Sequence, residues 1–385
     1  MLHPLTSLLL IATLQAAPGT PPVLDGAGLP SVELEIPDEH GGLDLFQFSP
    51  DGSILAGATR VGTVTWDDVQ SSFGGEVILW DPLTGKILKT LGSHRTSPTT
   101  LAFSADGSRL LSYSREDHNA RLWSVPDGRL IADVSLGGPG SRKQPPVLSP
   151  DGSTVLHLAE RTLELGKGIE VSYLVEAWHL EEGRRLWTRS VEEPTAQLDV
   201  WFDISPDGKS VALSSVKILW AAVGEEARGA YLEGAHELLS LESGTPIWSV
   251  PLDLRSSKRR HPGKQLLFTP DGSGVLMVDR ETMHHYAVAD GSPVGEPIDL
   301  EADESVEGIH FSADGDHFMV TRFFDRQLEI RSFPDGAELF RVSFDFPDKL
   351  SSGIPAPDLH RVVGQISFSG PQVIDLGSGF AGSDE

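Results

Sequence analysis

Short apolar segments that alternate with polar positions run along most of the chain, and they predict β-strands. Leu43-Asp-Leu-Phe-Gln-Phe48, Val77-Ile-Leu-Trp80 and Leu328-Glu-Ile330 are examples. Alternation with a period of two places apolar side chains on one face of an extended segment. No long stretch has the period of 3.6 residues that an amphipathic helix requires. The pattern therefore predicts an all-β protein.

One turn motif recurs between these segments: an apolar residue, Ser or Thr, Pro or Ala, Asp and Gly. Pro presets φ, Ser and Asp bond to nearby backbone, and Gly takes the positive φ that closes a bulged hairpin. This chemistry predicts a tight turn at every copy. Six clear copies begin at Phe48, Phe103, Leu148, Ile204, Phe268 and Phe311, and a decayed seventh lies around Pro357, Asp358 and Leu359.

A second string follows each copy, with a residue that is usually apolar or aromatic five positions before a glycine. Seven first turns thus alternate with seven second turns. Two hairpin turns per unit imply four antiparallel strands per unit, and radial repetition is how such a chain hides its sheet edges. The second strings run from Trp80, Trp123, Trp178, Leu239, Tyr286, Arg331 and Ile374 to Gly85, Gly128, Gly183, Gly244, Gly291, Gly336 and Gly379.

These strings resemble WD40 repeats over nearly all of residues 31–380, and the second repeat is the most similar. His94 follows Gly-Ser where the family has Gly-His, and Ser112 or Ser114, Asp117 and Trp123 lie near the positions of the family's buried hydrogen-bonding tetrad. The resemblance implies a seven-bladed β-propeller with a structural tetrad in its second blade. Other units depart from the pattern, because the dipeptides that begin at Leu239 and Arg331 lack the family's Trp-Asp. We leave the subfamily open.

The two ends of the chain indicate how the ring closes. After Gly379 too few residues remain for a fourth strand in the seventh unit, whereas a surplus strand, Ser31-Val-Glu-Leu-Glu-Ile36, precedes the first turn. We expect residues 31–37 to complete the last blade, which removes two exposed sheet edges at once. The predicted domain is a single propeller over residues 31–380, followed by a tail at 381–385.

The N-terminus is typical of a secretory signal. An apolar run over residues 8–14 ends in small residues at Ala16 and Ala17, and it is shorter than the about 20 residues that span a bilayer. We predict a signal peptide at 1–17, a Pro- and Gly-rich linker at 18–30, and export of a chain without a membrane span. The alternative is a frayed apolar N-terminus.

Units one, three and four carry extra residues between their second and third strands, and these residues read as hairpins that extend one face. Long structured insertions on one face of a repeat scaffold are usually where binding occurs. Aromatic residues are frequent interface anchors, although these could instead pack on a neighbouring blade. The candidates on the extensions are Trp66, Phe73, Trp220 and Tyr231.

Composition limits the partners. The chain has 385 residues, 56 acidic and 30 basic side chains, a formal net charge of −26 and no cysteine. The charge disfavours nucleic acid, and the missing cysteine excludes disulfides and thiolate metal sites. Basic residues nevertheless gather in connections between blades, although charged loops are often simply solvated. The basic candidates for binding are Arg95, Arg142, Lys143, Lys258, Arg259 and Arg260.

No catalytic, metal or cofactor motif appears in the sequence. The function predicted from fold is a non-catalytic, monomeric protein-interaction scaffold that uses the face with the extended hairpins and needs no cofactor or metal. The alternative is an exported propeller enzyme of lactonase, quinoprotein or glycan-active type with a site at the central channel. Channel candidates for that alternative are Asp44, Asp199, Glu307 and His310.

Overall fold

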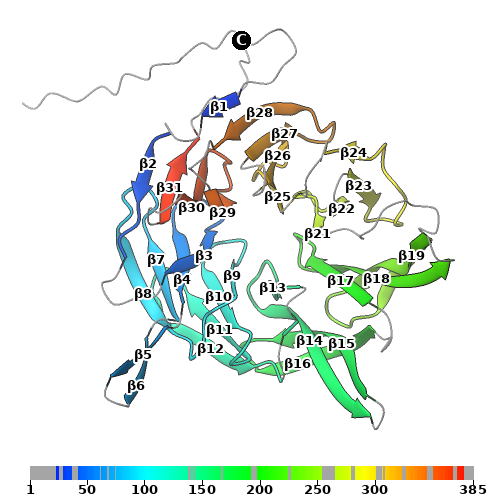
Figure 1. The fold of residues 1–385 in the computed structure, drawn as a ribbon, viewed down its shortest axis with the longest axis horizontal. Helices are drawn as coiled ribbons and strands as arrows, with labels where there is room; N and C mark the ends of the chain where they lie inside the picture. Colours follow the sequence, from blue (N-terminus) through cyan, green and yellow to red (C-terminus); the bar gives the residue numbers. More distant parts are fainter. Residues whose placement is uncertain are drawn as a thin grey trace, which may run out of the picture.

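The computed structural model forms a ring of seven β-sheets (Figure 1). Among the described residues all regular structure is strand, and no helix is long and apolar enough to cross a membrane. The structure describes residues 23–25, 29–36, 42–60, 62–66, 69–73, 75–137, 140–141, 144–165, 168–191, 197–223, 227–253, 265–278, 282–300, 306, 308–322, 327–344, 350–366 and 371–376.

Blades 1 to 4 are antiparallel four-stranded meanders whose first strand lies innermost in the ring (Figure 1). Blade 1 contains β3 (Leu43–Phe48), β4 (Leu55–Thr59), β7 (Glu76–Trp80) and β8 (Ile87–Ser93). Blade 2 contains β9 (Thr100–Phe103), β10 (Arg109–Ser114), β11 (Asn119–Ser124) and β12 (Leu130–Ser135). Blade 3 contains β13 (Val147–Leu148), β14 (Thr154–Leu165), β15 (Gly168–His179) and β16 (Arg184–Val191). Blade 4 contains β17 (Gln197–Ile204), β18 (Ser210–Val223), β19 (Ala227–Ser240) and β20 (Pro246–Asp253).

Blades 5 to 7 continue the ring, and two N-terminal strands join them. Blade 5 contains β21 (Gln265–Phe268), β22 (Gly274–Val278), β23 (Thr282–Ala287) and β24 (Ile298–Asp299). Blade 6 contains β25 (Gly308–Phe311), β26 (His317–Arg322), β27 (Gln327–Ser332) and β28 (Glu338–Ser343), with β1 (Val23–Asp25) as a fifth strand. Blade 7 contains β29 (Leu350–Pro355), β30 (Arg361–Ile366) and β31 (Pro371–Asp375), and its outermost strand is β2 (Ser31–Glu33).

The recurring turns form as the sequence predicts. In the first turn of blade 1, the Ser49 hydroxyl donates to Asp51 at 2.6 Å and the Ser53 amide donates to the same carboxylate at 3.0 Å. These bonds lower the pKa of Asp51. Gly52 has φ +67°, and the closing glycines of the other five clear copies also have positive φ. In the decayed copy, Leu359 takes this conformation at φ 57°.

The core is divided among the seven contacts between adjacent blades. Each contact holds one cluster of buried apolar side chains from two neighbouring blades. Between blades 7 and 1, for example, Trp80 is completely buried and packs with Leu34 and Val373. Because a sheet buries its faces only against its neighbours, every blade depends on the next one around the ring.

The N-terminal segment contains more structure than the sequence predicts. Residues 18–30 read as a linker, but β1 lies inside them and pairs in parallel with β28, Val23 opposite Arg341 and Asp25 opposite Ser343. The outer edge of β28 presents backbone groups that an added strand can pair. The predicted signal peptide at 1–17 and the tail at 381–385 lie outside the described residues.

Candidate functional site

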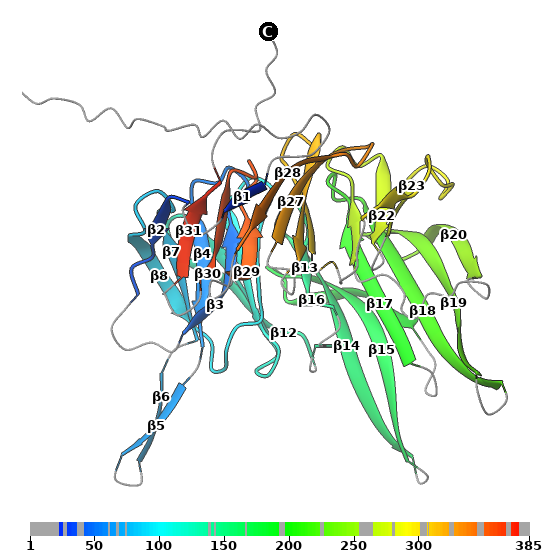
Figure 2. The ribbon, with the colours of Figure 1, turned by 45° about the horizontal axis from the view of Figure 1, so that its top comes forward.

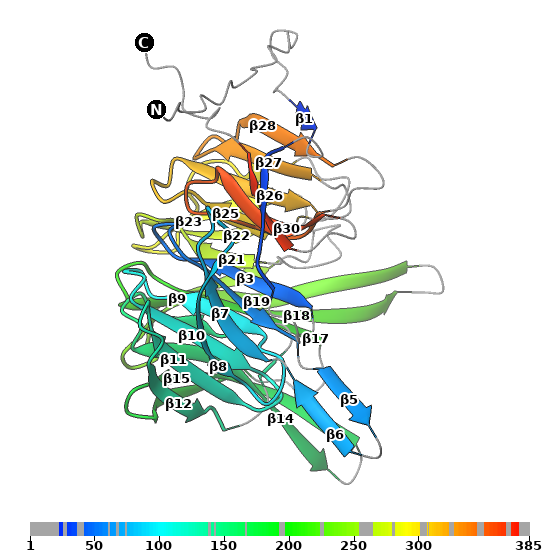
Figure 3. The ribbon, with the colours of Figure 1, turned by 90° about the vertical axis from the view of Figure 1, so that its left-hand side faces the viewer.

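Three long hairpins project from one face of the ring (Figure 2). In blade 1, β5 (Gly62–Trp66) and β6 (Val69–Phe73) form a separate two-stranded sheet between β4 and β7. In blades 3 and 4 the second and third strands themselves lengthen, to 12 residues each in β14 and β15 and 14 each in β18 and β19. Figure 3 shows the same three projections from the side. The predicted extensions are therefore confirmed as hairpins.

The four aromatic candidates lie on two of these hairpins. Trp66 pairs with Val69 next to the tip of the β5–β6 hairpin, and Phe73 pairs with Gly62 at its base. Trp220 and Tyr231 occupy adjacent rungs of the β18–β19 ladder, opposite Ala230 and Leu219. The structure therefore places the two pairs on separate hairpins, one on blade 1 and one on blade 4.

Most basic candidates for binding lie outside the described residues: Arg142, Lys143, Lys258, Arg259 and Arg260. Arg95 is described and exposed, and its backbone amide donates to the Asp117 carboxylate at 3.1 Å. Its position beside His94 places it on the connection between blades 1 and 2, at the hairpin face.

Three side chains of blade 2 and His94, from the connection that precedes it, meet in a buried polar group, which we call the tetrad. The Ser112 hydroxyl lies 2.8 Å from Nε2 of His94 and accepts the indole N–H of Trp123 at 2.9 Å. Asp117 approaches His94 Nδ1 at 3.5 Å. Burial lowers the pKa of His94, and Asp117 opposes that shift. The tetrad therefore links the connection before blade 2 to both middle strands of the blade and to the loop that joins them.

Replacing Ser112 by alanine is expected to cost about 1 to 3 kcal/mol of unfolding free energy, because two buried donors or acceptors lose their shared partner. Ser214 provides the matched control, since it is equally buried in blade 4 and its hydroxyl has no hydrogen-bond partner among the described residues. Ser214→Ala should be neutral or slightly stabilising. Urea denaturation of both variants measures the difference, and equal costs would contradict the role of the Ser112 hydroxyl.

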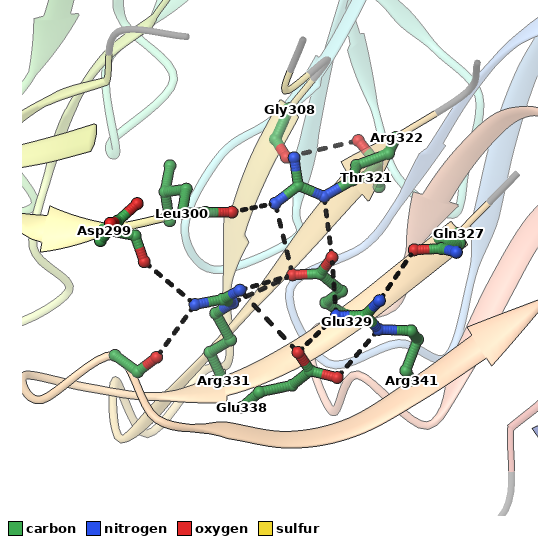
Figure 4. A network of polar contacts seen from close by, with 11 residues as sticks. Asp299, Leu300, Gly308, Thr321, Arg322, Gln327, Glu329, Arg331, Glu338 and Arg341 are labelled. Carbon is green, nitrogen blue, oxygen red and sulfur yellow. Dashed lines mark hydrogen bonds and ion pairs between the residues drawn. The ribbon is translucent and has the colours of Figure 1, made fainter. Parts of the chain in front are cut away.

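Blade 6 replaces this arrangement by a buried ionic network (Figure 4). Arg331 stands where blades 1 to 3 have tryptophan, and its Nε donates to Glu329 at 3.0 Å. Arg322 also donates to Glu329, at 2.8 Å, and Arg341 bonds Glu338 at 2.6 Å. Arg322, Glu329 and Arg331 are each at most 3% exposed. The pKa of Glu329 is lowered because the two arginines outweigh the opposing effect of burial.

The network also connects two blades. Nη1 of Arg331 donates to the carbonyls of Asp299 in blade 5 and Gly336 in blade 6, both at 3.2 Å. Arg322 donates to the carbonyl of Leu300 in blade 5. The sequence signals the departure at Arg331 alone, since Arg322 and Glu329 gain their roles only when β26 and β27 are paired side by side.

The channel candidates do not form a described cluster. Asp44, Asp199 and His310 lie on the innermost strands of blades 1, 4 and 6, and Glu307 lies outside the described residues. Burial lowers the pKa of His310 to about 4. In the described part of the chain, no three His, Asp or Glu side chains are placed to hold a metal ion.

Comparisons with known proteins agree with this architecture. No family model matches the sequence. WD repeat-containing protein 18 of Mus musculus is 35% identical over 118 residues, which cover 30% of this chain and 23% of that protein. WD repeat domain phosphoinositide-interacting protein 1 of Homo sapiens is 30% identical over 104 residues, 27% of this chain and 21% of that protein. The chain is a β-propeller that is similar to WD repeat proteins. It spans less than a quarter of the length of these curated relatives.

A solved structure has the same fold over most of this chain. Hydrazine synthase of Kuenenia stuttgartiensis superimposes with a TM-score of 0.56 and 15% sequence identity, covering 89% of this chain and 97% of that one. At that identity the match concerns the fold alone. The WD40-like propeller thus has its architecture in common with proteins of more than one function.

Proposed function

We propose that the propeller is a non-catalytic binding platform that captures a protein partner on the face bearing the three hairpins. The observation that carries this proposal is the placement of β5–β6, β14–β15 and β18–β19 on the same face (Figure 2). Similarity to WD repeat proteins supports a protein partner in general terms.

The middle strands of blades 3 and 4 are longer than the corresponding strands of the other blades. In blade 4 the ladder of β18 and β19 continues from the buried Val216, opposite Gly234, to Val223, opposite Ala227. Continuous backbone pairing along both strands holds each of these arms away from the ring (Figure 2). Rigid arms around a surface reduce the ordering entropy lost when a partner binds.

Shortening the arms tests the proposal. Replacing residues 162–171 by Asn-Gly would join Arg161 to Ser172, and replacing 219–231 by Asn-Gly would join Ile218 to Leu232; both joined pairs are already opposite one another. Asn-Gly suits a two-residue hairpin turn. We expect each variant to keep a thermal midpoint near that of the full chain but to lose most partner capture in a quantitative pull-down from native extract.

Leu83→Ala is the matched control, because Leu83 is 70% exposed in a turn on the opposite face. It should capture the partner like the unchanged chain. Unchanged capture by both shortened variants would refute the role of the hairpin face. A thermal shift with a small ligand and no captured protein would instead favour the channel enzyme of the alternative hypothesis.

We also propose that the propeller is an exported monomer whose first 17 residues are removed. The apolar run at 8–14 and the small residues that follow support this proposal. N-terminal sequencing of the protein recovered from its producing cells, together with its mass in solution, tests both points. An intact N-terminus in the cytoplasm would contradict export.

A further inference from the structure

A groove of about 740 Å³ lies between blades 5 and 6, away from the hairpin face. One wall is the outer segment of blade 5 around Val294 to Asp299, and the other is the turn of blade 6 around Phe333 to Glu338. Its volume is within the range of ligand pockets, about 300 to 1,000 Å³. The proposed function does not use this groove.

The first wall exists because the outer strand of blade 5 is interrupted. The amide of Val294 donates to the carbonyl of His285 at 2.8 Å, and pairing resumes where Ile298 lies opposite Met283. Between these rungs, residues 295–297 face the single residue His284 of β23. Gly295 has φ +68°, which allows the bulge. The bulge holds Glu296 and Pro297 out beside the groove.

The floor is apolar and well packed. Phe333 stacks edge to face on Phe311, with ring centroids 5.1 Å apart, and its ring lies 5.7 Å from that of His285. Burial lowers the pKa of His285, so this imidazole is neutral at pH 7. Val294, at 41% exposed, adds an uncovered apolar side chain at the wall.

The rim is acidic. Glu296, Asp299, Asp335 and Glu338 line the groove, against one basic residue, Arg331. The charge of Arg331 is already compensated by Glu329 at 2.9 Å. Asp335 stays ionised because the Ser332 hydroxyl and the Ala337 amide lower its pKa. The groove therefore combines an apolar floor with an acidic rim, in which Glu338 is paired with Arg341 at 2.6 Å and the carboxylates of Glu296 and Asp335 are exposed.

We propose that this groove binds a short peptide segment of a partner protein that carries lysine or arginine beside an apolar side chain. Charge complementarity selects the basic side chain, and the floor around Phe333 and Val294 accepts the apolar one. The walls favour a peptide over an enclosed small molecule, because Val294, Glu296 and Asp335 are all exposed and leave the groove open along its length. The site is separate from the hairpin face and would hold a second contact.

The test measures binding of a fluorescein-labelled hexapeptide, Leu-Arg-Leu-Lys-Leu-Arg, by fluorescence anisotropy at physiological salt. We expect Glu296→Lys to weaken binding at least tenfold. Glu242→Lys makes the same charge change at an exposed position of blade 4, and it should weaken binding less than twofold. Equal effects of both variants would mean that the peptide only follows the net charge, which would overturn the proposal.

Because the chain has no cysteine, a single introduced thiol can carry a dye that reports where the peptide binds. Ala337→Cys places a single thiol for an environment-sensitive dye at the groove, and Thr245→Cys places one at the same turn position of blade 4; both residues are exposed. We expect a saturable dye response at position 337 and none at position 245. A response at both positions, or at neither, would contradict binding in the groove. The hairpin-shortened variants should bind the hexapeptide normally, so this test and that of the proposed function fail separately.

Discussion

Deleting residues 31–37 is expected to lower the thermal midpoint far more than deleting residues 18–30. β2 pairs with β31 over Ser31 to Glu33, and the Leu34 amide then donates to the carbonyl of Pro371 at 3.1 Å. Leu34 is only 6% exposed and packs in the core between blades 7 and 1. Its deletion leaves an unpaired edge on β31 and an opening in that core.

The deletion also removes an acceptor from blade 1. The indole N–H of the fully buried Trp80 donates to the carbonyl of Glu35 at 2.8 Å. Loss of one buried leucine, at about 1.5 to 3 kcal/mol, and of one buried acceptor, at about 1 to 3 kcal/mol, gives a cost on the order of 5 kcal/mol. Removing 18–30 takes away the three-residue pairing of β1, the bond from the Asp375 amide to the Pro30 carbonyl and the packing of the partly buried Leu29.

Differential scanning calorimetry of the two deletions measures this contrast, and equal midpoints would rule out closure of the ring by β2. Two single substitutions test the contribution of Leu34 separately. Leu34→Ala should destabilise by about 2 to 5 kcal/mol, whereas Ile36→Ala, at a residue 40% exposed, should cost far less.

Glu329→Gln is expected to destabilise the propeller by about 3 to 5 kcal/mol, because it leaves buried arginines without their counter-charge. Glu329 bonds Arg322 and Arg331, and the three side chains are at most 4% exposed. The variant preserves the shape of the side chain, so the loss of unfolding free energy measures the contribution of charge compensation. Urea denaturation monitored by tryptophan fluorescence provides the measurement.

Blade 2 supplies the control, since Arg121 and Asp133 occupy the strand positions that Glu329 and Arg341 have in blade 6, with the signs reversed. That pair is 3.1 Å apart but partly exposed, at 16% and 37%. Asp133→Asn should cost less than about 1 kcal/mol. If Glu329→Gln costs no more than Asp133→Asn, the network does not stabilise the contact between blades 5 and 6. In the double variant Glu329→Gln/Arg322→Met, part of the loss should be recovered.

Local chemistry explains why much of the fold can be predicted from the sequence. A turn such as Ser49 to Gly52 specifies its own geometry through bonds within five residues, so each copy signals a hairpin independently of its surroundings. Seven such turns and the seven turns of the second string together indicate the number of strands. The tetrad can be predicted only from the resemblance to WD40 repeats, because His94 and Ser112 lie 18 residues apart in the sequence.

The groove and the ionic network could not be predicted in the same way. Arg322 contacts Glu329 because β26 and β27 pair, and Arg331 contacts Asp299 because blades 5 and 6 adjoin. The bulge at Gly295 interrupts a strand that the repeat pattern would leave continuous. β1 was missed because a three-residue parallel pairing has almost no sequence signal.

The pairing of β2 with β31 also has a consequence for the time course of folding. Val32 lies opposite Val373, so one of the first strands to be synthesised must wait for one of the last. Contacts of such sequence separation form slowly. While blades 1 to 6 assemble during synthesis, β2 and the unfinished edge of the ring stay open to other chains. Aggregation should therefore be most severe when synthesis stalls before residue 371.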